Sequence, residues 1–185
     1  MAYEGGGDRG KAERFRSAAL PYLDDVYTLA RYLLRNTADA EDAAQECYLR
    51  AFRHFETFRG GPIKPWLLAI LRNVCRAEHA RRGALAGILA DGLDDADQAV
   101  EGLWNEAGQS PETETLRRLD SESMQRLIKQ LPDAFREALV LREINDLSYR
   151  EIADVTGLPV GTVMSRLARA RALLRAAWLA EEKRL

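Results

Sequence analysis

The stretch that decides the fold of the C-terminal half is SYREIADVTGLPVGTVMSRLARARALLR, residues 148–175. Ser148 and Glu151 match the S-x-x-E capping box, which predicts a helix that begins there. Gly157 predicts the end of that short helix, and Pro159 predicts the start of a second, longer helix. A short helix, a glycine turn and a longer helix are the parts of a helix-turn-helix unit.

The second helix of this unit is basic and has no acidic residue. Residues 160–175 contain four arginines and no carboxylate, although the whole chain has a formal net charge of -2. A helix in the major groove of DNA lies between two rows of phosphates, which attract arginines and repel acids. The apolar positions that predict its buried stripe are Val163, Leu167, Ala170 and Leu174. With that stripe in the core, the side chains predicted to face duplex DNA are Thr162, Ser165, Arg166 and Arg169.

The rest of the chain also follows helical periodicity, and no segment shows the alternation of a β-strand. Helices are predicted at 9–18, 21–35, 39–58, 66–81, from about Thr115, and at 132–144. Asp39 is expected to be the N-cap of the third of these helices. The expected fold class is therefore all-α, with one small helical domain at 9–82 and another at 115–180.

An acidic segment, 83–114, separates the two predicted domains. The slightly longer stretch 83–116 contains eight acids and no lysine or arginine. Glycines interrupt its weak helical pattern, so we interpret 83–114 as a linker. The excess of basic residues is concentrated at 59–82 and 160–175, which predicts two basic surfaces joined by a negatively charged connector.

Composition argues against several other classes of protein. The longest apolar run, near 84–90, is far shorter than the roughly 20 residues that cross a bilayer. The N-terminal MAYEGGGDRGK lacks the features of a signal peptide, so a cytoplasmic protein is expected. Cys47 and Cys75 have no CxxC spacing and are expected to be buried thiols. His54 and His79 match no metal or catalytic motif, so we expect no enzyme, no cofactor and no metal site.

Two blocks of the chain carry a resemblance to a known family. The block LPDAFREALVLREINDLSYREIADVTGLPVGTVMSRLARARALLR, at 131–175, resembles domain 4 of bacterial sigma factors. EDAAQECYLRAFRHFETFRG, at 41–60, and PWLLAILRNVCRAEHARR, at 65–82, resemble domain 2. This order, with no domain between the blocks, is similar to the extracytoplasmic-function (ECF) group. The resemblance implies a factor that binds core RNA polymerase, recognises the -35 and -10 promoter elements and promotes strand opening.

The resemblance also implies which residues contact these partners. In the family a D-x-x-Q-E motif docks on the polymerase core, and the matching residues here are Asp42, Gln45, Glu46 and Leu49. The following segment binds the -10 element as single-stranded DNA, and the matching residues here are Arg59, Lys64, Arg72, Asn73 and Arg76. Trp66 is expected to be a core residue rather than a base-stacking one. Met164 departs from the family, in which many members have a lysine or arginine at that position.

A third expected partner and one alternative function complete the sequence-based interpretation. In the ECF group a dedicated anti-sigma factor commonly occludes both domains. Opening DNA costs about 1.4 kcal/mol for each stacking step, so melting is expected to require the polymerase. The alternative is a dimeric helix-turn-helix repressor or activator with an N-terminal sensing domain, which would bind a palindrome. It explains 115–178 equally well, but it leaves the basic surface at 59–82 unexplained.

Overall fold

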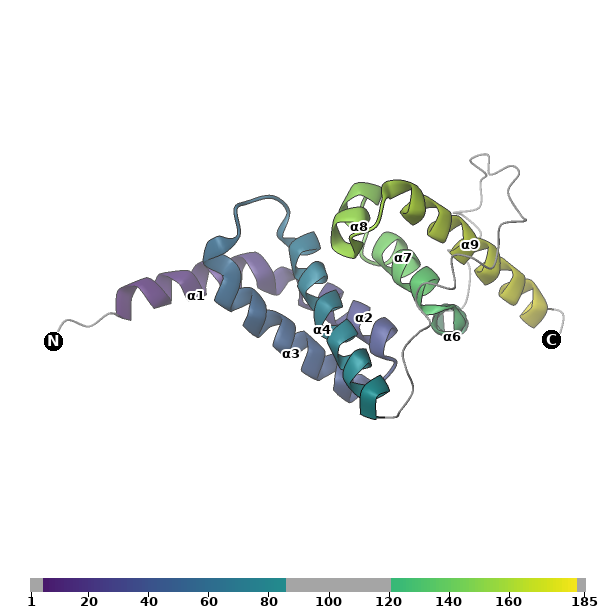
Figure 1. The fold of residues 1–185 in the computed structure, drawn as a ribbon, viewed down its shortest axis with the longest axis horizontal. Coiled ribbons are helices and arrows are strands. Elements are labelled where there is room, and N and C mark those ends of the chain that lie inside the picture. The colour runs from purple at the N-terminus through teal and green to yellow at the C-terminus, as the bar shows by residue number, and fades with distance from the viewer. Residues whose placement is uncertain (1–4, 86–120, 183–185) are drawn as a thin grey trace.

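The computed structural model describes residues 5–85 and 121–182, and every regular element within these two ranges is a helix (Figure 1). We call residues 5–85 the N-terminal unit and residues 121–182 the C-terminal unit. The elements of the N-terminal unit are α1 (Gly5–Ala19), η1 (Leu20–Tyr22), α2 (Leu23–Leu34), α3 (Thr37–His54), η2 (Phe55–Thr57) and α4 (Ile63–Leu85). Those of the C-terminal unit are α6 (Ser121–Gln130), α7 (Asp133–Glu143), α8 (Tyr149–Thr156) and α9 (Val160–Glu182). The predicted all-α class is confirmed, while most of the acidic segment lies outside the described residues.

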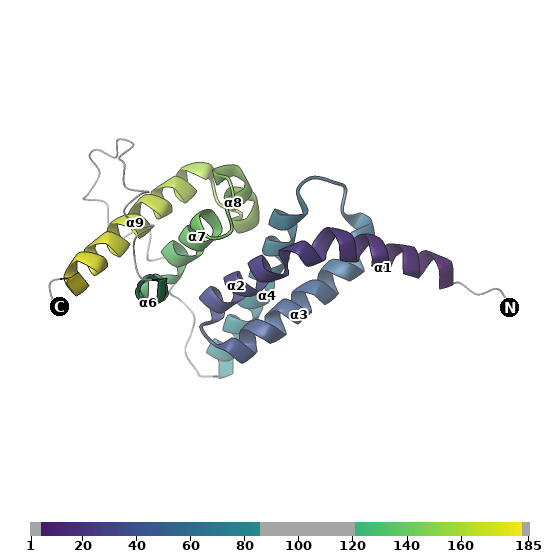
Figure 2. The same ribbon diagram turned by 180° about the vertical axis from the view of Figure 1, so that it is seen from behind.

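The N-terminal unit is built on three helices, α2, α3 and α4, each of which packs against the other two. The side of α3 that faces its neighbours is made of alanines and Cys47, so the helices can approach closely. Helix α1 projects away from this bundle (Figure 2). Phe15 anchors it through edge-on ring contacts with Tyr48, Phe52 and Phe55, at centroid distances of 5.3 to 6.1 Å.

The start of α3 differs from the prediction. The N-cap is Asn36, whose side chain accepts a hydrogen bond from the backbone N–H of Asp39 at 3.3 Å. Asp39 instead lies in the first turn, where it forms an ion pair with Arg82 of α4. Both residue types cap helices well, so the prediction chose the wrong one of two candidates three residues apart.

The C-terminal unit has the predicted helix-turn-helix. Ser148 and Glu151 form the capping box: Ser148 Oγ accepts from the Glu151 N–H at 3.3 Å, and Glu151 Oε2 accepts from the Ser148 N–H at 2.8 Å. Gly157 ends α8 with a φ of 71°, a left-handed conformation that glycine adopts without strain. The predicted stripe of α9 is buried at all four positions, Val163, Leu167, Ala170 and Leu174.

The capping box makes stability depend on pH. The hydrogen bonds from Ser148 lower the pKa of Glu151 below its ordinary value. A carboxyl whose pKa is lowered by folding stabilises the protein above its unfolded pKa, and this contribution is lost as the pH falls through the folded pKa. We expect Glu151→Gln to destabilise the protein by about 0.5 kcal/mol at pH 7 and by less at pH 3.5. Urea unfolding at both pH values measures the difference, and an equal cost at both would show that the charge contributes nothing.

The two units pack against each other, α2 against α7 and α4 against α8 (Figures 1 and 2). Their buried apolar residues form one continuous core. Asn145, in the turn after α7, is fully buried, and its Nδ2 donates to the backbone oxygen and to Oδ1 of Asp25, each at 3.2 Å. Residues 120 positions apart in the chain are therefore held together by hydrogen bonds.

Candidate functional site

An exposed face runs along α3 opposite its buried alanines. Asp42, Gln45 and Leu49 are exposed on it, and Leu49 keeps 52% of its surface accessible. Glu46 is half-buried and accepts a hydrogen bond from Arg50 Nε at 2.6 Å. The residues of the predicted docking motif therefore share one face of α3, and the contact of this face with a partner stays a prediction.

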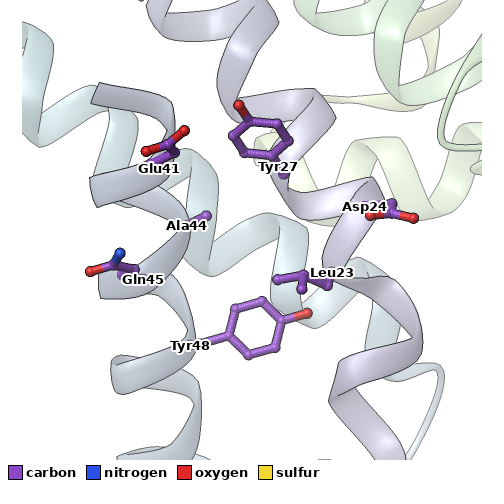
Figure 3. Close-up of a pocket in the computed structure, with 7 residues that line it drawn as sticks. All are labelled: Leu23, Asp24, Tyr27, Glu41, Ala44, Gln45 and Tyr48. Atoms are coloured by element: carbon purple, nitrogen blue, oxygen red, sulfur yellow. The ribbon is translucent and has the colours of Figure 1, made fainter. Parts of the chain in front are cut away.

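A hollow of about 350 Å³ lies beside this face, between α2 and α3. In Figure 3 the ring of Tyr27 from α2 and the ring of Tyr48 from α3 lie on either side of Ala44. Gln45 belongs both to the predicted docking motif and to the wall of the hollow. The seven lining residues are Leu23, Asp24, Tyr27, Glu41, Ala44, Gln45 and Tyr48.

Leu23, the first residue of α2, is exposed and lines this hollow. The Tyr48 hydroxyl donates to the backbone oxygen of Ala19 at 2.9 Å, which holds the ring in place, and burial raises the pKa of Tyr48. The hollow has apolar walls and two carboxylates, Asp24 and Glu41. It suits an apolar side chain from a partner that also carries positive charge.

The loop predicted to contact the -10 element lies between η2 and α4. Gly60 and Gly61 have φ values of 91° and 100°, a conformation that a side chain would strain. Arg59, just before them, is exposed. Trp66 is half-buried, with its ring centroid 4.8 Å from that of Phe58, in agreement with a packing role.

Three of the five predicted -10 residues are exposed, Arg59 in the loop and Asn73 and Arg76 on α4. An exposed amide beside an exposed arginine can hydrogen-bond a base edge while the guanidinium binds the backbone.

The other two predicted -10 residues, Lys64 and Arg72, form ion pairs within the protein. Lys64 Nζ lies 2.8 Å from Asp25 Oδ1. Arg72 Nε lies 2.7 Å from Glu137 Oε1, and its Nη2 lies 3.4 Å from Oε2, so the pair is bidentate. The resemblance implied that Lys64 and Arg72 contact DNA, whereas in this structure both pair with acids of the same chain.

The reason is that α4 packs against α8 as well as against α2 and α3. Leu68, Arg72 and Cys75 recur at helical spacing, and Leu68 and Cys75 are both buried. The sequence interpretation predicted a helix at 66–81 but did not predict this contact with α8. It also missed Glu137, a glutamate on α7 that no local signal distinguishes from an ordinary surface acid.

The predicted -35 residues lie in the first turns of α9, but not all are exposed. Thr162, Ser165 and Arg169 are half-buried, and Ser165 Oγ donates to the backbone oxygen of Thr162 at 2.9 Å. Arg166 is only 8% exposed, which contradicts the predicted outward orientation. It lies three residues after Val163 and four before Ala170, so it flanks the buried stripe. Arg166 and Arg169 both have interaction partners in this structure.

Within 5–85 and 121–182 no group of three or more histidine, cysteine or acidic residues could hold a metal ion. In the same two ranges none of the helices has both the length and the apolar character that a membrane span needs. Cys47 and Cys75 are free and buried as predicted, and burial raises the pKa of each thiol to about 12.

Comparison with known proteins divides the chain in the same way. The family profile described as Sigma-70 region 2 matches residues 19–84, and that described as Sigma-70, region 4 matches residues 121–174. The chain is 33% identical to the RNA polymerase sigma-H factor of Pseudomonas aeruginosa, over 88% of this chain and 85% of that protein. It is 31% identical to the ECF RNA polymerase sigma factor SigW of Bacillus subtilis, over 90% of each protein.

A solved structure is also similar over most of its length. It is the sigma factor RpoE from Bartonella quintana, in complex with the anti-sigma factor NepR. The match has a TM-score of 0.68 and 26% identity, and it covers 89% of this chain and 96% of that one.

Proposed function

Because this chain belongs to the ECF RNA polymerase sigma factors, we propose that it binds core RNA polymerase and directs it to promoter DNA. The observation that carries the proposal is the presence of region 2 at 19–84 and region 4 at 121–174, in that order, on one chain. We assign domain 2 to 9–82, the linker to 83–114 and domain 4 to 115–180. The dimeric repressor or activator does not account for region 2 in the N-terminal half.

The polymerase contact is proposed on α3 and the neighbouring hollow. Exposed Leu49 supplies apolar area, while Asp42 and Gln45 supply polar groups on the same face. Apolar area surrounded by polar groups is the usual anatomy of a protein interface. The carboxylates around the hollow favour basic side chains on the polymerase.

The DNA contacts are proposed on both units. Asn73 would hydrogen-bond an unpaired base of the -10 element, while Arg59 and Arg76 would bind its backbone. In the C-terminal unit Thr162, Ser165, Arg166 and Arg169 would contact the -35 element in the major groove. For Arg166 this requires its side chain to leave the buried position that it has here.

Partner proteins and location follow from the family. The related RpoE was solved with an anti-sigma factor, and we propose that this protein also has one. A factor that acts on chromosomal DNA works in the cytoplasm. The proposed role is one of binding, without a reaction catalysed by this chain.

Run-off transcription with purified core polymerase and sheared genomic DNA tests the function and does not require the promoter sequence to be chosen beforehand. Sequencing of the transcript 5′ ends should reveal a common pair of upstream elements. We expect Asn73→Ala to abolish transcripts while leaving core affinity within twofold, because Asn73 contacts only DNA. Core binding without any transcript from genomic DNA would refute the proposal.

A second measurement isolates the polymerase contact. We expect Leu49→Glu to weaken binding to core at least tenfold, because it places a charge at the centre of an apolar contact. Leu179→Glu is the matched control, since Leu179 is also an exposed leucine but lies near the end of α9. Equal losses in the two variants would contradict the assignment of the docking face to α3.

A further inference from the structure

The contact between the two units occupies part of the surface that the proposed function assigns to the -10 element. Arg72 of α4 and Glu137 of α7 form their bidentate pair at this contact. The two side chains are only 11% and 12% exposed. An ion pair so shielded from water is not weakened by salt as surface pairs are.

A second group of polar contacts joins the same surfaces. Asp25 of α2 accepts from Asn145 of the C-terminal unit and also pairs with Lys64, another predicted -10 residue. Hydrogen bonds from Ser148 lower the pKa of Glu151, and the charge of Lys64 lowers it further, so Lys64 acts across the contact. A third pair, Arg35 with Asp133 at 3.1 Å, is exposed and contributes little.

The chemistry of the Arg72–Glu137 pair is that of a phosphate contact. A guanidinium presents two parallel N–H groups, which fit the two oxygens of a carboxylate or of a phosphate equally well. Arg72 cannot hold both at once. Glu137 therefore competes directly with a DNA phosphate for this arginine.

We propose that the C-terminal unit closes the free protein. Glu137 occupies the guanidinium of Arg72, where a DNA phosphate would otherwise bind, and the -10 strand binds only after this contact opens. The inference rests on the proposed role of Arg72. It requires no other protein, because the inhibiting group belongs to the same chain. The affinity of the free protein for the -10 strand is then reduced by the fraction of open molecules.

The closed state can be measured without DNA or polymerase. The distance between the units is reported by two spin labels on the full chain, one at Arg53→Cys and one at Ala176→Cys. Arg53 is an exposed residue of α3, and Ala176 is an exposed residue of α9. The native Cys47 and Cys75 are buried with raised pKa values, so little of either is present as the reactive thiolate. The labels therefore attach to the introduced cysteines.

The decisive variant is Glu137→Gln, which removes one charge of the pair. Its matched control is Glu143→Gln on the same helix, because Glu143 pairs with Arg171 inside the C-terminal unit, at 2.6 Å. We expect the ratio of open to closed molecules to rise at least tenfold in the first variant, as when one partner of a shielded pair is removed. In Glu143→Gln the ratio of open to closed molecules should stay within twofold of that of the parent chain.

A charge exchange separates this pair from a general loss of packing. Glu137→Arg should open the protein further, since it places two guanidinium groups together. Adding Arg72→Glu to that variant should restore the closed distance. Unchanged distances in both Glu137→Gln and Glu137→Arg would overturn the proposal.

The DNA measurement uses a labelled single-stranded oligonucleotide carrying the -10 sequence found by transcription. Without polymerase, Glu137→Gln should bind it up to tenfold more tightly than the parent chain and Glu143→Gln. An open Glu137→Gln protein with parental affinity would overturn the competition. If the parent chain initiates no transcription, the proposed function fails, whereas the distance measurement still decides the closure.

Discussion

Leu167→Ala is expected to destabilise the C-terminal unit by about 3 to 4 kcal/mol. Leu167 is fully buried in the middle of the stripe by which α9 packs against α6, α7 and α8. Truncation leaves a cavity that three neighbouring helices cannot fill without moving. Urea unfolding followed by circular dichroism measures the loss.

The control for this variant lies on the same helix. Leu173 is 42% exposed, so Leu173→Ala should change the stability by no more than about 0.5 kcal/mol. Transcription activity should fall in Leu167→Ala and stay near the parent level in Leu173→Ala, because α9 presents the predicted -35 residues only while its buried stripe is packed. Similar costs for the two substitutions would mean that the packing of α9 is wrongly described.

Arg136→Met is expected to cost about 2 to 4 kcal/mol, although it replaces a charge by an apolar side chain of similar length. Arg136 is 1% exposed, and its Nη1 donates to the backbone oxygens of Leu131 at 2.7 Å and Lys129 at 3.4 Å. Its Nη2 pairs with Asp133. Methionine would leave the carbonyls at the end of α6 without this donor and Asp133 without this partner.

Burial lowers the pKa of Arg136, but an arginine stays charged throughout the physiological range. Replacing a buried ion pair by apolar groups can be neutral when both partners are replaced, whereas here the acceptors remain. The control is Arg126→Met, because Arg126 is an exposed arginine of α6 that bonds only Ser123 among the contacts described. If both variants unfold at the urea concentration of the parent chain, Arg136 has no structural role.

Most of the helix-turn-helix could be predicted because its signals are local. A capping box acts over three residues, a C-terminal glycine acts at one position, and a buried stripe repeats within a single helix. For the same reason Thr162 and Ser165 could be placed near the start of α9. Arg166 could not be placed so simply, because it flanks the buried stripe and its long stem can be buried while its charged end finds polar contacts.

The start of α3 illustrates a smaller error. Asn36 and Asp39 are both able to cap, and the sequence rule contains nothing that prefers one over the other. In this structure Asn36 caps the helix, and the side chain of Asp39 forms an ion pair with Arg82, 43 residues later in the chain.

Periodicity and capping within single segments were enough to predict the helices of the described residues, the helix-turn-helix and the buried stripe of α9. The state of the proposed -10 surface depended on contacts between the units. Arg72 meets Glu137 and Asp25 meets Asn145 only because α4 and α2 pack against α8 and α7. A helical pattern records which residues share a face, but it contains no information about which distant segment covers that face. Only the packing of the two units decides whether Arg72 is open to a partner or pairs with Glu137.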